Sequence, residues 1–355
     1  MPAQTLLLYL NSSIGRAILL PLAGLAMLAL AIELREKATL LLAQGGVEAL
    51  LLYALYAVPE ILVTVAPIAL LAGAILGFAL LERRSEAVIL RASGLSALQI
   101  AAALLPLGLI LGAGLHVLDD RLVPLSEDRR SAAFGTAGAG DEEDRMIWLR
   151  MPGWVLRAQP LDQQGRELGK VTLFALGPEG ALERRIDARH ASYGDDGWAL
   201  KNATVTSAET GEGTSVKALD WSFALSPKDV RALENSDRAL SRASAQAVLA
   251  GERLATEPRS FYEMRAARAI SLAAMPIVLI LLAVPVVLGS ARSDAALIQA
   301  TAISAALGLA FVMGEGIATS LGEKGLVAPM VAAWVPVLSA LLLGLWAVLW
   351  TEGEG

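Results

Sequence analysis

The residues of this sequence that could support catalysis do not have the spacing that catalysis needs. The stretch 165–171 comes closest to a phosphate-binding loop, but its glycine spacing is wrong and Val171 stands where a Ser or Thr hydroxyl must reach the metal ion. His190, Ser192 and Asp195 have the residue types of a hydrolytic triad, yet three residues so close in one strand and turn cannot converge on one substrate atom. Neither histidine of the chain has a partner at metal-ligand spacing. The sequence predicts no enzyme activity, no cofactor and no metal site.

One ionisable residue lies within a long apolar stretch. Glu315 stands in the run 295–317, with Phe311 one helical turn before it. An ionisable group at membrane depth is a candidate for function, so this pair is a candidate gate or relay. A carboxylate near the end of the run can also reach water, so both interpretations stay open.

The most informative polar segment is 81–96, between two apolar runs. On a helix, Glu86 and Leu90 share a face with Ile89 beside them, which predicts a short amphipathic rod with an acid at its start. Gly94 has the residue type of a carboxyl-terminal helix stop. On these features alone, an ordinary solvated loop is the alternative.

Long apolar helices must carry these residues. The chain of 355 residues is 55% hydrophobic and has a mean hydropathy of +0.56, which is high for a water-soluble domain. About 20 apolar residues are needed to cross a bilayer, and six runs qualify. An apolar helical lead-in at 47–58 precedes the second span. The predicted spans are 17–32, 61–81, 98–118, 269–288, 295–317 and 327–350.

A polar block separates the first three spans from the last three. Its short runs of β-branched and aromatic residues, with Gly and Asp turns between several of them, predict antiparallel strands of a sandwich or jelly roll. The expected strands are 146–149, 154–158, 171–176, 198–206 and 216–225, followed by helices at 239–249 and 260–269. The predicted domains are helices 1–118, including the segment 82–96, then the β-domain 119–258, then helices 259–355.

Charge in the short loops predicts how the chain is oriented. An even number of spans puts both termini on one side and the β-domain on the other. Basic residues in short loops favour cytoplasmic termini and a periplasmic β-domain, although three arginines before the fourth span count against this. The three are Arg259, Arg265 and Arg268. The net charge of −6, without any basic run, argues against nucleic acid as a partner.

The segment 84–94 resembles the cytoplasmic coupling helix of the lipopolysaccharide export permeases, the LptF/LptG family. In that family the pattern Arg-Ser-Glu, three apolar residues, a basic residue and Ala-Ser-Gly follows the second span. The segment 67–77 resembles the family's second span, and the order of three spans, β-domain and three spans extends the resemblance over essentially the full length. The pattern of apolar residues, alanine and glycine in the second span is more similar to LptG than to LptF. The matching residues are Arg84, Ser85, Glu86, Arg91, Ala92, Ser93 and Gly94.

The resemblance implies a transport subunit of the bacterial inner membrane. The implied partners are a cytoplasmic ABC ATPase dimer, a sister permease, periplasmic jelly-roll transport proteins and lipopolysaccharide. The family commonly has a basic residue in its first span for the glycolipid phosphates, whereas here only Arg35 and Lys37 follow an uncharged span, so they are the implied glycolipid contacts. The implied ATPase-coupling residues are Arg84, Ser85, Glu86, Ile89, Leu90, Arg91, Ser93 and Gly94.

Two other functions fit the same layout. A secondary transporter would use a relay around Glu315, and a non-transporting anchor would only present the β-domain to partners. For an exporter, alternation along the strand puts Val171, Leu173 and Ala175 on one face, and we expect either this set or the alternate set to line an apolar path for acyl chains.

Overall fold

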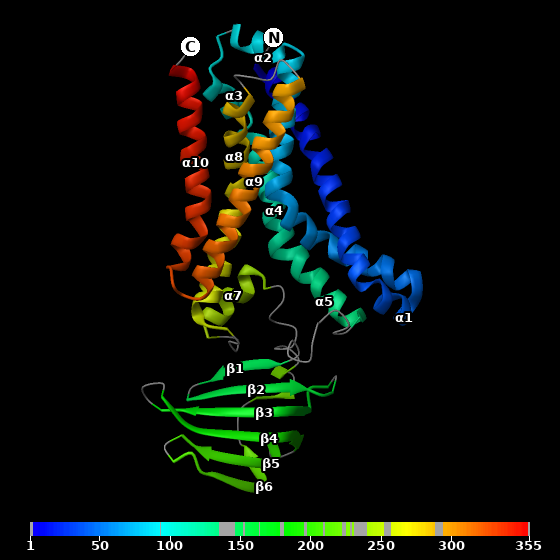
Figure 1. The fold of residues 1–355 in the computed structure, drawn as a ribbon, viewed down its shortest axis with the longest axis vertical. Coiled ribbons are helices and arrows are strands. Elements are labelled where there is room, and N and C mark those ends of the chain that lie inside the picture. Colours follow the sequence, from blue (N-terminus) through cyan, green and yellow to red (C-terminus); the bar gives the residue numbers. More distant parts are fainter. Residues whose placement is uncertain are drawn as a thin grey trace. The chain divides into compact units, whose positions relative to one another are not determined.

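The chain folds into two compact units, a helical one and a β-rich one. The first unit is Met1–Ser126 with Glu263–Gly355, and the second is Glu127–Tyr262 (Figure 1). The computed structural model describes residues 3–92, 94–134, 146–151, 153–162, 164–177, 181–194, 197–208, 210–221, 225–227, 229–230, 240–251, 257–287 and 294–353.

Helix α1 (Ala3–Arg83) consists of two arms joined by a sharp turn. Its 81 residues would extend about 120 Å if straight, roughly four times the hydrocarbon thickness of a bilayer. Gly45 and Gly46 break the helix, and Gly46 has a φ of 64°, which glycine adopts without steric cost. The second arm runs back beside the first (Figure 1). It stays helical through Pro59, so the predicted lead-in and second span form one continuous helix.

Beyond α1, the longest helices coincide with predicted apolar runs. Among the residues the structure describes, three helical stretches are long and apolar enough to cross a membrane: Leu7–Arg83, Arg259–Val284 and Pro329–Trp350. The first of these contains both arms of α1. Membrane-spanning helices are thus confirmed, while the count of six stays a prediction. The helices are α2 (Glu86–Ala92), α3 (Ala97–Ala103), α4 (Leu105–Val117), the π-helix η1 (Leu118–Leu122), α5 (Val123–Phe134), α7 (Arg242–Leu249), α8 (Arg259–Val287), α9 (Asp294–Glu323) and α10 (Pro329–Gly353).

The predicted third span is divided in the structure. It consists of α3 and α4, which meet at Leu104, and Pro106 stands in the first turn of α4. Proline has no amide hydrogen to donate to the preceding turn, which favours a break in the helix at this point.

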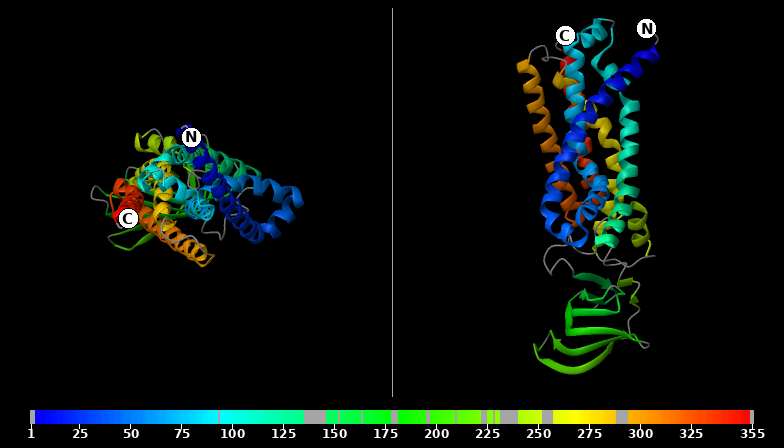
Figure 2. Two further views of the ribbon diagram at one scale, coloured as in Figure 1. Left: turned by 90° about the horizontal axis from the view of Figure 1, so that it is seen from above. Right: turned by 90° about the vertical axis from the view of Figure 1, so that its right-hand side faces the viewer.

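The helical unit has two distinguishable ends. The start of α1, the end of α10 and α2 lie together at one end, whereas the turn between the arms of α1 and the start of α10 lie at the other (Figures 1 and 2). This arrangement agrees with an even number of crossings.

Glycines spaced four residues apart allow close packing of the two arms of α1. A Cβ atom at Gly73 would overlap the Cα of Ile18, and one at Gly77 would lie 2.7 Å from Cδ1 of Ile14. Helices in lipid gain little from the hydrophobic effect, so close backbone approach at small residues is what stabilises their packing.

A second glycine pair joins α4 to α8. A Cβ at Gly108 would lie 2.8 Å from Cγ1 of Ile277, and one at Gly112 would overlap the carbonyl oxygen of Ala273. The partners are also four residues apart, so the two helices are in contact over at least one full turn.

In the part of the chain that the structure describes, six antiparallel strands form one sheet in the order of the sequence. The predicted antiparallel β-domain is therefore confirmed, while its finer description as a jelly roll stays a prediction. The stretch 165–171 leads into a strand and not into the helix that a phosphate-binding loop requires. The strands are β1 (Ile147–Met151), β2 (Trp154–Pro160), β3 (Glu167–Leu176), β4 (Leu182–Gly194), β5 (Gly197–Ser207) and β6 (Gly213–Trp221).

One face of the sheet carries the core of the β-rich unit. Val171, Leu173 and Ala175 are all buried, as the alternation along β3 predicts. Leu225 packs into the same core, and its carbonyl oxygen accepts a hydrogen bond of 2.8 Å from Nε1 of Trp198. The role of this apolar face as an acyl-chain path stays a prediction.

Candidate functional site

The segment predicted to be an amphipathic rod folds as the short helix α2. It begins at Glu86, directly after Ser85, which has a φ of 61°. At the other end Gly94 has a φ of 88°, and the amide of Leu95 donates to the carbonyl of Leu90 over 3.3 Å. This is the hydrogen bond of a Schellman motif, which ends a helix at a left-handed residue. The helix therefore stops where Gly94 was expected to stop it.

An apolar side chain of α2 faces water. Ile89 is 66% exposed and Leu90 is partly buried, while Arg84 and Ser85 before the helix are exposed. Side chains 91 and 93, which the sequence also places in this group, lie outside the described residues. An exposed isoleucine one helical turn from the carboxylate of Glu86 is a surface that suits contact with another protein.

Glu86 has a partner that the sequence did not indicate. The hydroxyl of Tyr9, near the start of α1, donates to Oε2 of Glu86 over 2.8 Å. Two residues further along α1, Asn11 contacts the junction of α3 and α4. The start of α1 thus contacts both the beginning of α2 and the junction of α3 and α4.

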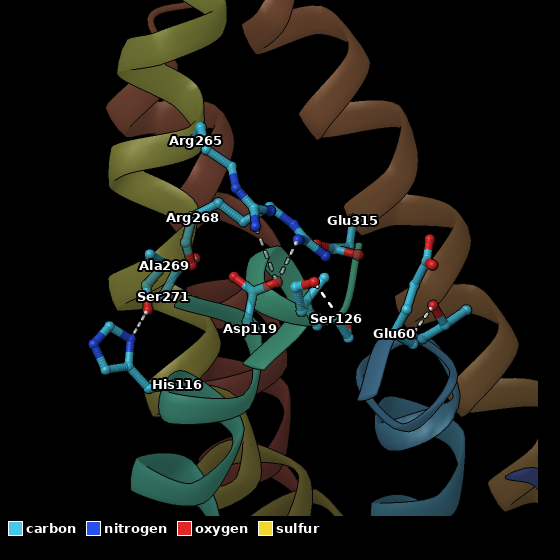
Figure 3. A network of polar contacts seen from close by, with 11 residues as sticks. Glu60, His116, Asp119, Ser126, Arg265, Arg268, Ala269, Ser271 and Glu315 are labelled. Atoms are coloured by element: carbon cyan, nitrogen blue, oxygen red, sulfur yellow. Dashed lines mark hydrogen bonds and ion pairs between the residues drawn. The ribbon is translucent and has the colours of Figure 1, made fainter. Parts of the chain in front are cut away.

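Ion pairs between buried and partly buried side chains join three helices of the same unit (Figure 3). In α8, Nη2 of Arg265 lies 3.3 Å from Oδ1 of Asp119, and Nε of Arg268 donates to Oε1 of Glu315 over 2.7 Å. Arg268 also lies 4.0 Å from Asp119. Asp119 is only 4% exposed and lies in the π-helix η1, and such widened turns are rare. These pairs connect η1, α8 and α9.

Two further polar groups belong to the same region. Nδ1 of His116 lies 2.8 Å from the carbonyl oxygen of Ala269, so this histidine makes a contact between helices. A carbonyl only accepts, so Nδ1 carries the hydrogen in this contact. Burial raises the pKa of Glu323, beyond the predicted span 295–317, while the positive charges of Arg268 and Arg265 oppose this rise.

The ion pair with Arg268 gives a structural reason for the carboxylate of Glu315, the candidate gate residue. Phe311 is buried, and Glu315 is held by Arg268, with side chains that are 25% and 22% exposed respectively. A proton relay through Glu315 would have to break this ion pair in every cycle. The contacts therefore favour a structural role for Glu315.

The two basic residues after the first predicted span differ in their surroundings. Nζ of Lys37 donates to the hydroxyl of Tyr53 over 2.5 Å and lies 3.8 Å from Oε1 of Glu33. The Tyr53 hydroxyl in turn donates to Glu33 over 2.7 Å, which connects the two arms of α1. Arg35 is exposed. Of the two, Arg35 is more accessible to an anion.

Comparison with known families identifies the chain. The family model described as lipopolysaccharide export system permease LptF/LptG matches residues 8–350, nearly the whole chain. The chain belongs to the LptF/LptG family. Members of this family are the permeases of the lipopolysaccharide export system, so this one is a membrane transport subunit and not itself an enzyme. None of the curated proteins matches the chain.

Family membership leaves finer points as predictions. The LptF/LptG model describes both sister subunits together, so the assignment to LptG is a prediction. The roles of the individual residues in coupling and in glycolipid binding, which the resemblance implies, also stay predictions, because the match assigns no role to a residue.

The ion pair between Arg268 and Glu315 gives a first prediction for this LptF/LptG permease. Glu315→Gln should lower the free energy of unfolding in mixed micelles by about 2 kcal/mol, because the partly buried guanidinium loses a charge-assisted hydrogen bond. Glu36→Gln, at an exposed position, is the matched control and should change it by less than about 0.5 kcal/mol. Equal effects of the two substitutions would show that the pair does not stabilise the fold.

Proposed function

We propose that the chain is the permease subunit of an ATP-driven exporter that extracts lipopolysaccharide from the inner membrane and passes it to a periplasmic β-domain. A separate dimeric cytoplasmic ATPase supplies the energy, and a sister permease completes the membrane part. Periplasmic jelly-roll proteins then receive the lipid. The termini and α2 face the cytoplasm in this proposal.

The cost of lipid extraction supports an external source of energy. Burial of one CH₂ group in the bilayer is worth about 0.8 kcal/mol, so moving one 12-carbon chain into water costs on the order of 10 kcal/mol. Lipopolysaccharide carries several such chains. Its route must therefore stay apolar, first between membrane helices and then along the buried face of the sheet.

The observation that carries the proposal is the surface of α2. Glu86 begins this short helix and Ile89 is exposed beside it, at the end of the helical unit that also holds the start of α1 and the end of α10 (Figures 1 and 2). An accessible carboxylate next to an exposed apolar side chain suits docking of an ATPase surface that carries an arginine.

Co-purification tests the proposed partnership. The chain is expressed in its own membranes, extracted in mild detergent and isolated through a tag, and the bound proteins and lipids are identified. We expect an ABC-type ATPase, a second permease and lipopolysaccharide. Isolation without any ATPase, together with export that depends on the proton gradient, would support a secondary transporter instead.

The basic residues after the first predicted span give a second prediction. The double substitution Arg35→Gln with Lys37→Gln should reduce photo-crosslinking to lipopolysaccharide about tenfold, since two charged contacts to phosphate are lost. Arg35→Gln alone should cause most of the loss, because Lys37 already faces Glu33 and Tyr53.

Arg16→Gln is the matched control for this experiment. Like Arg35→Gln, it removes one positive charge from the same arm of α1, here near its start, and it should leave crosslinking unchanged. Undiminished crosslinking of the double variant would place the anion contacts elsewhere in the permease.

A further inference from the structure

A hydrogen bond between distant segments holds the coupling helix α2 against the start of α1. The donor is the Tyr9 hydroxyl, the acceptor is Oε2 of Glu86, and the two residues are 77 positions apart in the chain. Glu86 is the first residue of α2, so the bond acts on the amino-terminal end of this helix. The start of α1 and α2 lie side by side in both views (Figures 1 and 2).

Helix α2 needs such an anchor because it is too short to be stable alone. It has seven residues, whereas isolated helices below about 12 residues are marginal in water. Left-handed residues separate it from its neighbours on both sides, Ser85 with a φ of 61° and Gly94 with a φ of 88°. Tertiary contacts must therefore set its orientation.

Asn11 holds the other flank of the same segment. Its Nδ2 donates to the carbonyl of Ala103 over 2.9 Å, and its Oδ1 accepts from the amide of Leu107 over 3.0 Å. These bonds satisfy backbone groups where α3 ends and α4 begins. The segment from α2 to the first turn of α4 is thus tied at both ends to one short stretch of α1.

We propose that Tyr9 is a positioning residue for ATPase docking, with Asn11 fixing the far flank of the segment. An ionised carboxylate accepts about four hydrogen bonds, and Tyr9 occupies one site on Oε2 of Glu86. Oε1 is left to accept from an ATPase arginine, so the tyrosine orients the carboxylate and does not compete for it. The inference deepens the proposed function and rests on it.

Removal of one hydroxyl tests this role. Tyr9→Phe keeps the ring and removes the hydroxyl that donates to Glu86 and also interacts with Arg84. The ATPase that co-purifies with the permease is titrated against the permease complex in nanodiscs. We expect it to bind the variant about three- to tenfold more weakly, because the lost hydrogen bond has a charged acceptor but is exposed to solvent. ATP hydrolysis at saturating ATPase should stay unchanged, as should the thermal unfolding midpoint of the permease.

A control removes a hydroxyl from the same turn of α1. Ser12→Ala deletes a donor whose bond, 2.9 Å to the carbonyl of Tyr9, stays within α1. ATPase affinity of this variant should equal that of the unchanged chain. Equal affinity of Tyr9→Phe and Ser12→Ala would overturn the positioning role.

Hydrogen exchange tests the anchor without any partner. In the permease alone, Tyr9→Phe should speed exchange of the amides of residues 89–92 several-fold, and Ser12→Ala should not. Unchanged exchange in Tyr9→Phe would also overturn the inference. Failure of the unchanged chain to bind any ATPase would instead refute the proposed function, while the exchange experiment still decides whether Tyr9 holds α2.

Discussion

Glu86→Lys is expected to uncouple the permease from its ATPase while leaving it inserted in the membrane. The substitution reverses the charge that faces the proposed arginine of the ATPase and removes the acceptor for Tyr9. Loss of a charged pair at an interface costs about 2–5 kcal/mol, so the affinity for the ATPase should fall about thirtyfold or more. The measurement is the amount of ATPase recovered with the tagged permease, together with ATP-dependent release of lipopolysaccharide.

Glu48→Lys is the matched control for this charge reversal. Glu48 is exposed on α1, next to the turn at Gly45 and Gly46 and away from α2. This variant should retain both ATPase and export. If the Glu86 variant retains them equally well, the coupling assignment to α2 is wrong.

Gly112→Ala should destabilise the helical unit strongly. The added Cβ would overlap the carbonyl oxygen of Ala273, which is backbone, so α4 and α8 must separate. Overpacking of this kind typically costs about 1–3 kcal/mol, and we expect the upper end because no flexible side chain can yield. The thermal unfolding midpoint in detergent should fall by several degrees.

A neighbouring glycine on the same helix provides the control. At Gly114 no atom lies within 4 Å of the position of an added Cβ, and alanine favours a helix over glycine by up to about 1 kcal/mol. Gly114→Ala should therefore leave the midpoint unchanged or raise it. A fall as large as that of Gly112→Ala would mean that the glycine contacts do not determine the packing.

The strands were predictable wherever their residues were apolar or aromatic. Five of the six observed strands overlap the predicted runs, but β4 was missed. Its first residues, Leu182–Arg185, are exposed, and only positions such as Ile186 and Ala188 are buried. A strand with one solvent-exposed face and charged residues at its start lacks a clear pattern of apolar residues. Only its pairing with β3 and β5 reveals it.

The candidate site was predictable where it is local in sequence and not where it depends on tertiary contacts. The α2 motif is contiguous, so its helix and its stop at Gly94 could be predicted. Tyr9 has no local signal, because only folding brings it to Glu86.

The charge cluster could have been found, since Asp119, Arg268 and Glu315 all fall near span ends that the predicted topology puts on one side. Arg265 and Arg268 oppose that topology when they are counted as free loop charges. In the fold, Asp119 and Glu315 neutralise them through ion pairs.

The most direct test of an externally powered exporter is lipid release from reconstituted vesicles. The permease complex with its ATPase is inserted into vesicles that contain labelled lipopolysaccharide, and transfer to a soluble acceptor is followed with ATP, with a non-hydrolysable analogue, and with a proton ionophore. We predict that transfer requires hydrolysable ATP and is unaffected by the ionophore. Transfer without ATP or ATPase that stops when the proton gradient collapses would contradict the account.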